Sequence, residues 1–384
     1  MNQPTLSLLR AAKLKFSNIK SATRSAQSFA MQAAELSGLL QERPPVGIIV
    51  EKANWAIRWY GTFTAEAANK LRPGTAWVHT NPARMTRGLV EFGSQYQWVD
   101  WSDHISPSCR TVSTFFHGKP DDGAAAARHI ENFMKALPRL DKVICSASIV
   151  RDRLINWGVA QSKLALIPIG CETDRFVPPT PEQRRIIRER LGFPKDAIVV
   201  GSFQKDGEGW GDGNLPKLIK GPDVFLATID RLRRDHNIFV LLTGPARGYV
   251  KSGLERLGVP FVYHYAAERD EVARLYHALD LYLVTSREEG GPMGLMESMA
   301  SYVPVVSTYV GMAPDLIVNE RTGFVVKNPD PDLIAAKASQ IITLHDNAMA
   351  MKDNARKAVI ETDWSVVGRR QLEEVWRPLL KELT

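Results

Sequence analysis

Short apolar runs that alternate with helical stretches are the feature that most constrains how this chain folds. Residues 46–50 read VGIIV, a continuous apolar run of the kind that forms a parallel strand buried on both faces. Strands that alternate with helices predict an α/β domain with a parallel sheet. Further runs lie at 76–79, 111–116, 142–146 and 164–168, and the stretches 64–71, 124–137 and 149–157 between them are expected to be helices.

A second alternating series follows the Pro-rich segment 177–182 (VPPTPE), which is the predicted linker. Its expected strands are 198–201, 239–244, 261–263, 281–285, 304–307 and 323–326, and its expected helices are 224–234, 250–257, 271–279, 295–301, 331–344, 348–361 and 366–380. The chain has 384 residues, more than one hydrophobic core usually holds, so we expect two doubly wound α/β domains. Such domains bind ligands at the carboxyl ends of their strands, which predicts a cleft between two facing sheets.

The composition excludes several classes of protein. No run of about 18 apolar residues occurs, so we expect no helix that spans a membrane. The three cysteines, Cys109, Cys145 and Cys171, form neither a disulfide framework nor a CxxC pair for zinc. A reducing cytoplasm is therefore the expected location.

Positive charge is concentrated at the N-terminus. The net charge is 49 − 42 = +7, and residues 1–34 hold five basic and no acidic residues, which leaves +2 for the rest of the chain. This distribution argues against a nucleic-acid partner. One interpretation of the arm is an amphipathic helix on the inner face of a membrane, which would make the protein peripheral. The alternatives are a solvated helix or a loose arm on the first domain, and the composition also resembles a transit peptide.

The stretch 286–307 (SREEGGPMGLMESMASYVPVVS) carries the most chemistry. A predicted strand leads into a Gly-rich loop after Glu289, and the loop opens a helix that bears Glu297. Gly290 and Gly291 let a ligand approach the backbone closely. Exposed N–H groups at the start of the helix suit a phosphate. Because the two carboxylates bracket this turn, a nucleotide-sugar would fit lengthwise.

The spacing of Glu289 and Glu297, with Pro304-Val305-Val306 after them, resembles the Glu-x(7)-Glu signature of glycosyltransferase family 4-like proteins (glycosyl transferases group 1). Flanking segments that agree with that family are 167–176 (IPIGCETDRF), 278–281 (ALDL), 311–315 (GMAPD) and 322–326 (TGFVV). The resemblance implies the GT-B fold, with two Rossmann-like domains across a cleft. The predicted division is a basic arm (1–45), an acceptor domain (46–178), a donor domain (179–362) and a C-terminal helix (363–384) that returns toward the acceptor domain.

The resemblance also implies residues that bind the donor. In the family an Arg and a Lys-Gly pair neutralise the diphosphate, and Lys220-Gly221 matches the latter. Ser202 stands where the family has the Arg, and Lys205, in the insertion that follows, is a candidate for its place. Pro292 replaces a family glycine and has no N–H to offer a phosphate. The predicted donor-binding residues are Gly201, Ser202, Lys205, Lys220, Arg247, Glu289, Gly290, Gly291, Met293, Gly294 and Glu297. Surface positions remain the alternative for the lysines, and a solvated rim position remains that for Arg247.

Candidates on the acceptor side lie in the first half of the chain. His117 ends a strand as the family's His-Gly does, and a neutral imidazole there can bond a sugar hydroxyl. With Lys220 and Glu289 it forms the predicted catalytic set. Trp55, Trp59 and His79 are further candidates, because aromatic faces stack on sugar rings. Packing in the core is the alternative for each of these three, and capping of a strand end is the alternative for His117.

By this resemblance, the chain would transfer a sugar from a nucleotide-sugar, guessed to be a UDP- or GDP-sugar, to a hydroxyl of a saccharide or lipid-linked acceptor, with retention of configuration. Polysaccharide, glycolipid or other glycoconjugate synthesis is the expected setting. No cofactor and no metal are expected, since no DxD-type motif stands at a strand end. The alternatives are a catalytically silent carbohydrate- or nucleotide-binding protein of the same fold, or a nucleotide-sugar epimerase. An NAD-dependent oxidoreductase is disfavoured, because no GxGxxG follows the first strand.

Overall fold

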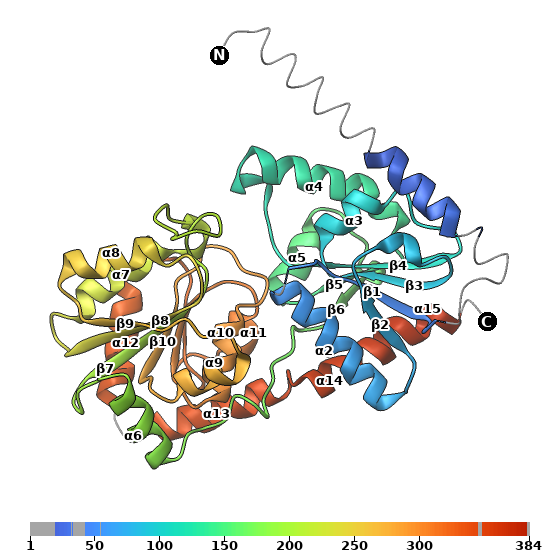
Figure 1. Ribbon diagram of the computed structural model, residues 1–384. Helices are drawn as coiled ribbons and strands as arrows, with labels where there is room; N and C mark the ends of the chain where they lie inside the picture. The colour runs from blue at the N-terminus through green and yellow to red at the C-terminus, as the bar shows by residue number, and fades with distance from the viewer. Residues whose placement is uncertain (1–19, 32, 34–42, 54, 345–347, 382–384) are drawn as a thin grey trace, which may run out of the picture. The chain divides into compact units, whose positions relative to one another are not determined.

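The computed structural model describes residues 20–31, 33, 43–53, 55–344 and 348–381, which form two compact units with one sheet each (Figure 1). Unit 1 comprises the described parts of residues 1–145 with 157–167 and 367–384, and unit 2 comprises 146–156 and 168–366. The chain therefore passes between the units at 145/146, 156/157, 167/168 and 366/367, whereas the prediction had it pass at 178/179 and 362/363. Residues 168–176 pack in unit 2. The Phe176 ring is fully buried there, and the Phe176 carbonyl accepts a hydrogen bond from Arg356 (3.0 Å).

The sheet of unit 1 has six parallel strands in the order β2-β1-β3-β4-β5-β6. The strands are β1 (Val46–Ile49), β2 (Ala76–His79), β3 (Gly88–Phe92), β4 (Cys109–Phe115), β5 (Lys142–Cys145) and β6 (Leu164–Leu166). Besides a helix at residues 20–31, the helices of this unit are α2 (Ala56–Leu71), α3 (Gln95–Trp101), α4 (Ala124–Ala136), most of α14 (Trp364–Arg370), a π-helical turn (Gln371–Trp376) and α15 (Arg377–Lys381). The strand order is that of a doubly wound sheet with a switch point between β1 and β3.

Two features of unit 1 were not predicted from the sequence. Strand β3 was not expected, since Glu91 interrupts its apolar run, and the structure buries that carboxyl completely. Helix α2 begins at Ala56 rather than at 64, so Trp59 and Tyr60 belong to the helix and not to a loop before it. Tyr60 is buried and donates a hydrogen bond to Glu91 (2.8 Å).

The sheet of unit 2 also has six parallel strands, in the order β12-β11-β10-β7-β8-β9. The strands are β7 (Ile198–Phe203), β8 (Ile238–Thr243), β9 (Phe261–Tyr263), β10 (Leu281–Val284), β11 (Val305–Thr308) and β12 (Phe324–Val326). The helices are α5 (Ser148–Asn156), α6 (Pro181–Arg190), α7 (Pro222–Leu232), α8 (Gly248–Leu257), α9 (Arg269–Tyr276), α10 (Met293–Ala300), α11 (Ala313–Leu316), α12 (Pro331–Leu344) and α13 (Met349–Ile360). From β9 inward this is the Rossmann order 3-2-1-4-5-6.

Apolar side chains of α7, α8 and α12 pack on one face of the unit 2 sheet, and α9, α10 and α13 lie on the other (Figure 1). The continuous apolar strands of the sequence are thus buried on both faces, as parallel sheets require. Helix α6 was not predicted. It begins at Pro181 with Thr180 as its N-cap, within the segment predicted to be the linker.

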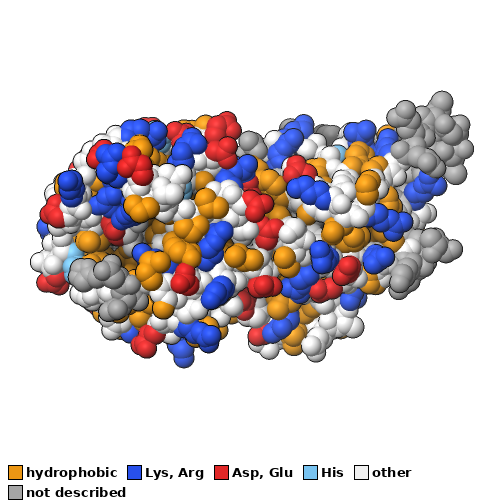
Figure 2. Space-filling model, turned by 90° about the horizontal axis from the view of Figure 1, so that it is seen from below, with side chains coloured by type: hydrophobic (Ala, Val, Ile, Leu, Met, Phe, Trp, Pro, Cys, Tyr) orange, Lys and Arg blue, Asp and Glu red, His pale blue; other side chains and the backbone are white. Residues whose placement is uncertain are grey.

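Charged side chains are interspersed over the face seen in Figure 2, with lysines and arginines next to aspartates and glutamates. The structure contains ion pairs with exposed members, for example Arg231 with Asp332 and Arg287 with Asp223. Such exposed pairs contribute little stability each. The mixed surface agrees with the small net charge outside residues 1–34.

Candidate donor site

The loops after β7 and β10 meet at one place on the sheet of unit 2. The two strands are neighbours, with Leu281 opposite Val200, but the chain continues from them to opposite sides of the sheet. This is a topological switch point, where doubly wound sheets bind ligands beyond the carboxyl ends of their strands. The loop after β7 carries Lys205 and Lys220, and the loop after β10 carries Glu289.

Two of the predicted catalytic residues are in direct contact here. Lys220 Nζ donates to Glu289 Oε1 at 2.6 Å, and Ser286 Oγ donates to the same oxygen at 2.8 Å. Gly221 makes this contact possible, because its φ is +64° and a Cβ there would lie 1.9 Å from the carbonyl oxygen of Thr285. The neighbouring Glu288 is paired with Arg153 (2.6 and 3.2 Å), so Glu289 is the carboxylate that contacts Lys220.

The insertion after β7 contains a folded hairpin. Lys217 N–H donates to the Asp206 carbonyl at 2.7 Å, and Gly207 and Pro216 form an antiparallel bridge. The hairpin is bound to the start of α8, where Gly248 N–H donates to the Asp212 carbonyl (2.7 Å). The backbone therefore brings Lys217 next to the segment that begins with Lys205.

Three lysines gather at the base of this hairpin: Lys205, Lys217 and Lys220. Burial lowers the pKa of Lys217, and the positive charges of Lys220 and Lys205 lower it further. The Lys205 ammonium also lies 4.4 Å from the centre of the Trp210 ring, which is 66% exposed. Lys217 was not predicted, since no motif marks it. A concentration of positive charge at a switch point suits a diphosphate.

Arg247 lies in the interior and not at a rim. Its side chain is 1% exposed and donates to the carbonyls of Ser202 (2.5 Å) and Thr243 (2.8 Å) and to Ser202 Oγ (3.1 Å). It also forms an ion contact with Asp206 (3.0 Å), whose geometry is not that of a hydrogen bond. Arg247 and Ser202 thus stabilise the start of the insertion, and a contact of either with a ligand would require these bonds to be replaced.

Glu297 lies on α10 with both carboxylate oxygens bonded. Oε1 accepts a hydrogen bond from Arg269 (2.7 Å) and Oε2 accepts one from Tyr276 (2.9 Å). Burial, and then the charge of Glu297, raises the pKa of Tyr276 well above its usual value, so the hydroxyl acts as a donor. Both partners come from α9, and neither was predicted, because no motif of the sequence includes them.

The glycines of the predicted site also have packing roles. A Cβ at Gly294 would lie 2.1 Å from the hydroxyl oxygen of Tyr282, and one at Gly201 would lie 2.4 Å from Leu279. A Cβ at Gly291 would lie 2.8 Å from Ile169, and the Gly290 carbonyl accepts a hydrogen bond from Ser146 (2.9 Å). Close packing therefore favours glycine at Gly201 and Gly294 whether or not a ligand is bound, whereas a Cβ at Gly291 would meet only the ends of flexible side chains.

The N-terminus of α10 follows Pro292, whose side chain does not cap it. The first turn carries the backbone N–H groups of Met293 and Gly294, and both residues are half-buried. Unsatisfied N–H groups at a helix start attract an anion. The structure thus places the predicted phosphate donors on the same sheet edge as the Lys220–Glu289 pair.

The acceptor-side candidates lie in unit 1. His117 follows β4 at its carboxyl end, and its carbonyl accepts a hydrogen bond from Gln95 (2.9 Å). Trp55 stands at the N-cap position of α2 without a side-chain cap bond, is 36% exposed and donates from Nε1 to Glu51 (2.9 Å). Trp59 is half-buried in the first turn of α2.

His79 occupies a packed position at the end of β2. Its ring stacks on Trp77, with the ring centres 4.1 Å apart, and it is 8% exposed. Burial first, and then the positive charge of Arg84, lowers its pKa to about 4. The imidazole is therefore neutral at pH 7, and its surroundings are those of a core histidine.

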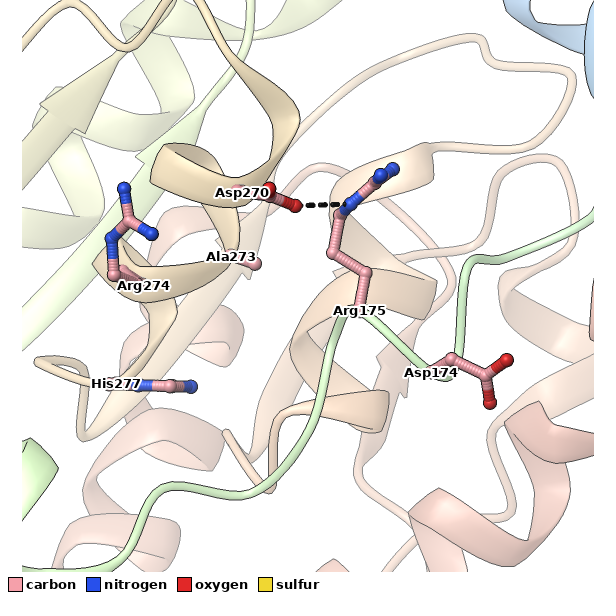
Figure 3. Close-up of a pocket in the computed structure, with 6 residues that line it drawn as sticks. All are labelled: Asp174, Arg175, Asp270, Ala273, Arg274 and His277. Carbon is pink, nitrogen blue, oxygen red and sulfur yellow. Dashed lines mark hydrogen bonds and ion pairs between the residues drawn. The ribbon is translucent and has the colours of Figure 1, made fainter.

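A cavity of about 410 Å³ opens on unit 2 between the segment after β6 and helix α9 (Figure 3). Asp174, Arg175, Asp270, Ala273, Arg274 and His277 line it. The side chains of Arg175 and Asp270 point toward one another and are bonded at 2.6 Å. Since both signs of charge line the cavity, it offers no concentrated field for a simple anion.

Within the described residues, no group of three or more His, Cys, Asp or Glu side chains is arranged to hold a metal ion. In that same part of the chain, none of the helices has the length and apolarity needed to cross a membrane.

The fold and the site define a protein with two Rossmann-like domains, one of which has a basic site at its switch point. Residues 213–358 match the family model described as "Glycosyl transferases group 1", which confirms the resemblance seen in the sequence. The part of the chain that carries Lys220, Glu289 and Glu297 is therefore a glycosyl transferases group 1 domain.

Curated relatives agree with this assignment. D-inositol 3-phosphate glycosyltransferase from Corynebacterium urealyticum is 28% identical over 234 residues, which are 57% of this chain and 52% of that protein. GDP-mannose-dependent alpha-(1-6)-phosphatidylinositol monomannoside mannosyltransferase from Mycolicibacterium smegmatis is 25% identical over 248 residues, 61% of each chain. The chain thus spans little more than half the length of these relatives.

A solved structure supports the fold over a longer stretch. Anabaena Alr3699/HepE in complex with UDP has a TM-score of 0.70 and 16% sequence identity, and the match covers 86% of this chain and 98% of that one. This likeness confirms the predicted architecture of two Rossmann-like domains.

Proposed function

We propose that the protein is a retaining glycosyltransferase that moves a sugar from a nucleotide-sugar to a hydroxyl acceptor. The observation that carries the proposal is the contact between Lys220 and Glu289 at the switch point of unit 2, beside two further lysines and the uncapped start of α10. A cation, a carboxylate and free N–H groups are what a sugar diphosphate requires.

Each group has a role in the proposed reaction. The anomeric C–O bond to the diphosphate breaks, and the acceptor oxygen bonds to the same carbon on the same face. The acceptor proton passes to the leaving phosphate oxygen. Lys220, Lys205 and Lys217 stabilise the negative charge that develops on this phosphate, and the N–H groups of Met293 and Gly294 add to the effect. Glu289 accepts hydrogen bonds from sugar hydroxyls and fixes the anomeric carbon in place.

The donor in this proposal is a UDP- or GDP-sugar, because one similar structure contains UDP and one relative is named for GDP-mannose. The acceptor is a saccharide or a lipid-linked polyol, in line with the inositol and phosphatidylinositol names of the relatives. With three lysines to balance the diphosphate, the reaction would proceed without a divalent metal. Activity that persists in EDTA is the expected result.

Contact with a membrane surface is part of the proposal. Residues 1–19 lie outside the described residues, and residues 20–31 form a helix whose Phe29 is 75% exposed. Arg24 of this helix is bound to Asp100 (3.0 Å), and residues 1–34 carry four further basic residues, which we propose contact anionic lipid. The proposed location is the cytoplasm, at its membrane.

Calorimetric titration with UDP and GDP tests the proposal. We expect one nucleotide to bind the wild type and Lys220→Met to weaken it at least tenfold. The matched control is Lys195→Met, which removes an exposed lysine of the same unit and should leave affinity unchanged. Failure of both nucleotides to bind would favour the silent alternative, and proton NMR of the product anomer would decide between retention and inversion.

A further inference from the structure

Glu297 is buried, with 5% of the residue exposed, and each of its two carboxylate oxygens accepts a hydrogen bond. Arg269 donates to one oxygen (2.7 Å) and Tyr276 to the other (2.9 Å). Two donors use about half of the lone-pair positions of a carboxylate. The rest can accept hydrogen bonds from a vicinal diol, provided that the carboxylate does not rotate.

Arg269 is itself fixed by a second carboxylate. Its Nε donates to Glu172 Oε2 at 2.7 Å, and a second nitrogen of the same guanidinium bonds that oxygen as well. The guanidinium carbon lies 4.9 Å from the centre of the Phe176 ring. Arg269 thus bridges Glu172 and Glu297 from a position that packing restricts.

The outer end of this arrangement lies at the cavity of Figure 3. Arg175 forms an ion pair with the other oxygen of Glu172, and Arg175 also bonds Asp270 (2.6 Å). Four charged side chains therefore link the cavity edge to Glu297. The Glu172 and Arg269 side chains are 10% and 17% exposed, so removing either one leaves its partner largely buried and uncompensated.

We infer that Arg269 is a positioning residue, which keeps Glu297 oriented to accept hydrogen bonds from the ribose diol of the donor nucleotide, and that Glu172 fixes Arg269 for this purpose. The inference rests on the proposed function, since it assigns the nucleotide end of the same site. A purely structural arginine would stabilise unit 2 without affecting how the ribose is recognised.

The experiment compares each ribonucleotide with its 2′,3′-dideoxy analogue, using UDP, GDP and the full chain. We expect the wild type to bind the ribose form at least about tenfold more tightly, since two hydrogen bonds to a charged group are lost in the analogue. Arg269→Met and Glu297→Gln should reduce this ratio to near one. Arg269→Lys keeps the charge but not the fork that reaches both carboxylates, so its ratio should be intermediate.

Arg188→Met is the matched control. Arg188 is another arginine of unit 2, it is buried, and it pairs with Asp280 (2.9 Å). Its loss should lower the thermal midpoint and leave the ribose preference intact. If Arg269→Met does not fold, Arg269→Lys and Glu172→Gln provide the same comparison.

The outcomes separate the inference from the proposed function. A wild-type ribose preference that persists in folded Arg269 variants would overturn the inference alone. Absence of nucleotide binding by the wild type would overturn the proposed function and the inference with it. A preference that falls in the Arg269 and Glu172 variants, but not in Arg188→Met, would support both.

Discussion

At the scale of single residues, the two units bury a carboxylate in different ways. Glu297 in unit 2 is compensated by a cation, whereas Glu91 in unit 1 is surrounded by the neutral donors Tyr60 (2.8 Å), Gln371 (2.5 Å) and Trp376 (2.6 Å). Burial raises the pKa of Glu91, although the hydrogen bonds from these three donors act to lower it. Glu91 therefore joins β3 and α2 to the C-terminal helix through uncharged partners.

Glu91→Ala should destabilise unit 1 by ~3 kcal/mol, because three buried donors lose their acceptor at once. Glu66→Ala is the control, since Glu66 is exposed on α2 and its loss should cost less than ~0.5 kcal/mol. Thermal unfolding followed by circular dichroism measures both. Equal midpoints for the two variants would show that the Glu91 contacts contribute no net stability.

His79 makes stability depend on pH. Its folded pKa is about 4, below the usual 6.5, so the unfolded chain binds a proton more readily between these values. Stability is therefore fully present above pH 6.5 and falls as the pH drops toward 4, by ~2 to 3 kcal/mol at pH 4.5. Comparison of thermal midpoints at pH 7 and pH 4.5 should show a smaller loss in His79→Leu than in the wild type. The control is the same replacement at the half-buried His236 of unit 2. An unchanged pH dependence in His79→Leu would contradict the assignment of this pH effect to His79.

At the scale of elements, the donor site depends on two loops that the sheet brings together. Lys220 and Glu289 are distant in sequence, and Gly221 permits their loops to touch through its left-handed backbone. The absence of a side chain at Gly221 is thus as necessary for the ion pair between Lys220 and Glu289 as the two charged groups are.

Gly221→Ala should disrupt the donor site and destabilise unit 2 by more than ~3 kcal/mol, since the new Cβ would overlap the Thr285 carbonyl. Gly209→Ala isolates the backbone effect: φ is +68° there, but no atom lies within 4 Å of the added Cβ. It should cost only ~1 kcal/mol. Nucleotide affinity and the thermal midpoint measure both effects, and similar values for the two variants would refute the steric argument.

The elements best predicted from the sequence were those with continuous apolar runs. Strands β2 and β9 and helix α12 have the expected bounds, and most other predicted elements differ by a few residues at their ends. Strand β3 and helix α6 were missed, because a buried charge and a Pro-rich start obscure their patterns. Periodicity reports the faces that a segment buries, and it fails where a tertiary contact compensates an unusual residue.

The candidate site was predictable in part, for a related reason. Lys220, Glu289 and Glu297 follow a recognisable spacing, and the structure brings the first two into contact. Arg269 and Lys217 were not predicted, since only the packing of α9 and the fold of the insertion give them neighbours. A partner that the fold supplies leaves no local signal in the sequence.

At the scale of the whole molecule, both units are doubly wound sheets, and the chain passes between them four times. Near the crossings at 167/168 and 366/367, a parallel β-bridge joins Cys171 and Asp363 in unit 2. In unit 1, Arg370 donates a hydrogen bond to the Leu166 carbonyl (2.8 Å). The chain thus returns to unit 1 beside the place where it left. The net charge of the remaining molecule is small, so electrostatic behaviour at long range depends on residues 1–34.

Binding to lipid vesicles tests whether the charges of residues 1–34 govern this electrostatic behaviour. The full chain should co-sediment with phosphatidylglycerol-containing vesicles at low salt and be released as salt rises, because cations near an anionic surface contribute about 1 kcal/mol each. Replacement of Arg10, Lys13 and Lys15 by Gln should weaken binding by ~3 kcal/mol, or more than about 100-fold.

The control for this test removes the same charge elsewhere. Lys195, Lys327 and Lys357 are exposed on unit 2, and their replacement by Gln should leave vesicle binding within about threefold of the wild type. Arg24→Gln should also have little effect, since that guanidinium already binds Asp100 and lies over the Trp101 ring. If the two triple variants lose affinity equally, binding follows net charge alone, and residues 1–34 are no specific contact for the membrane.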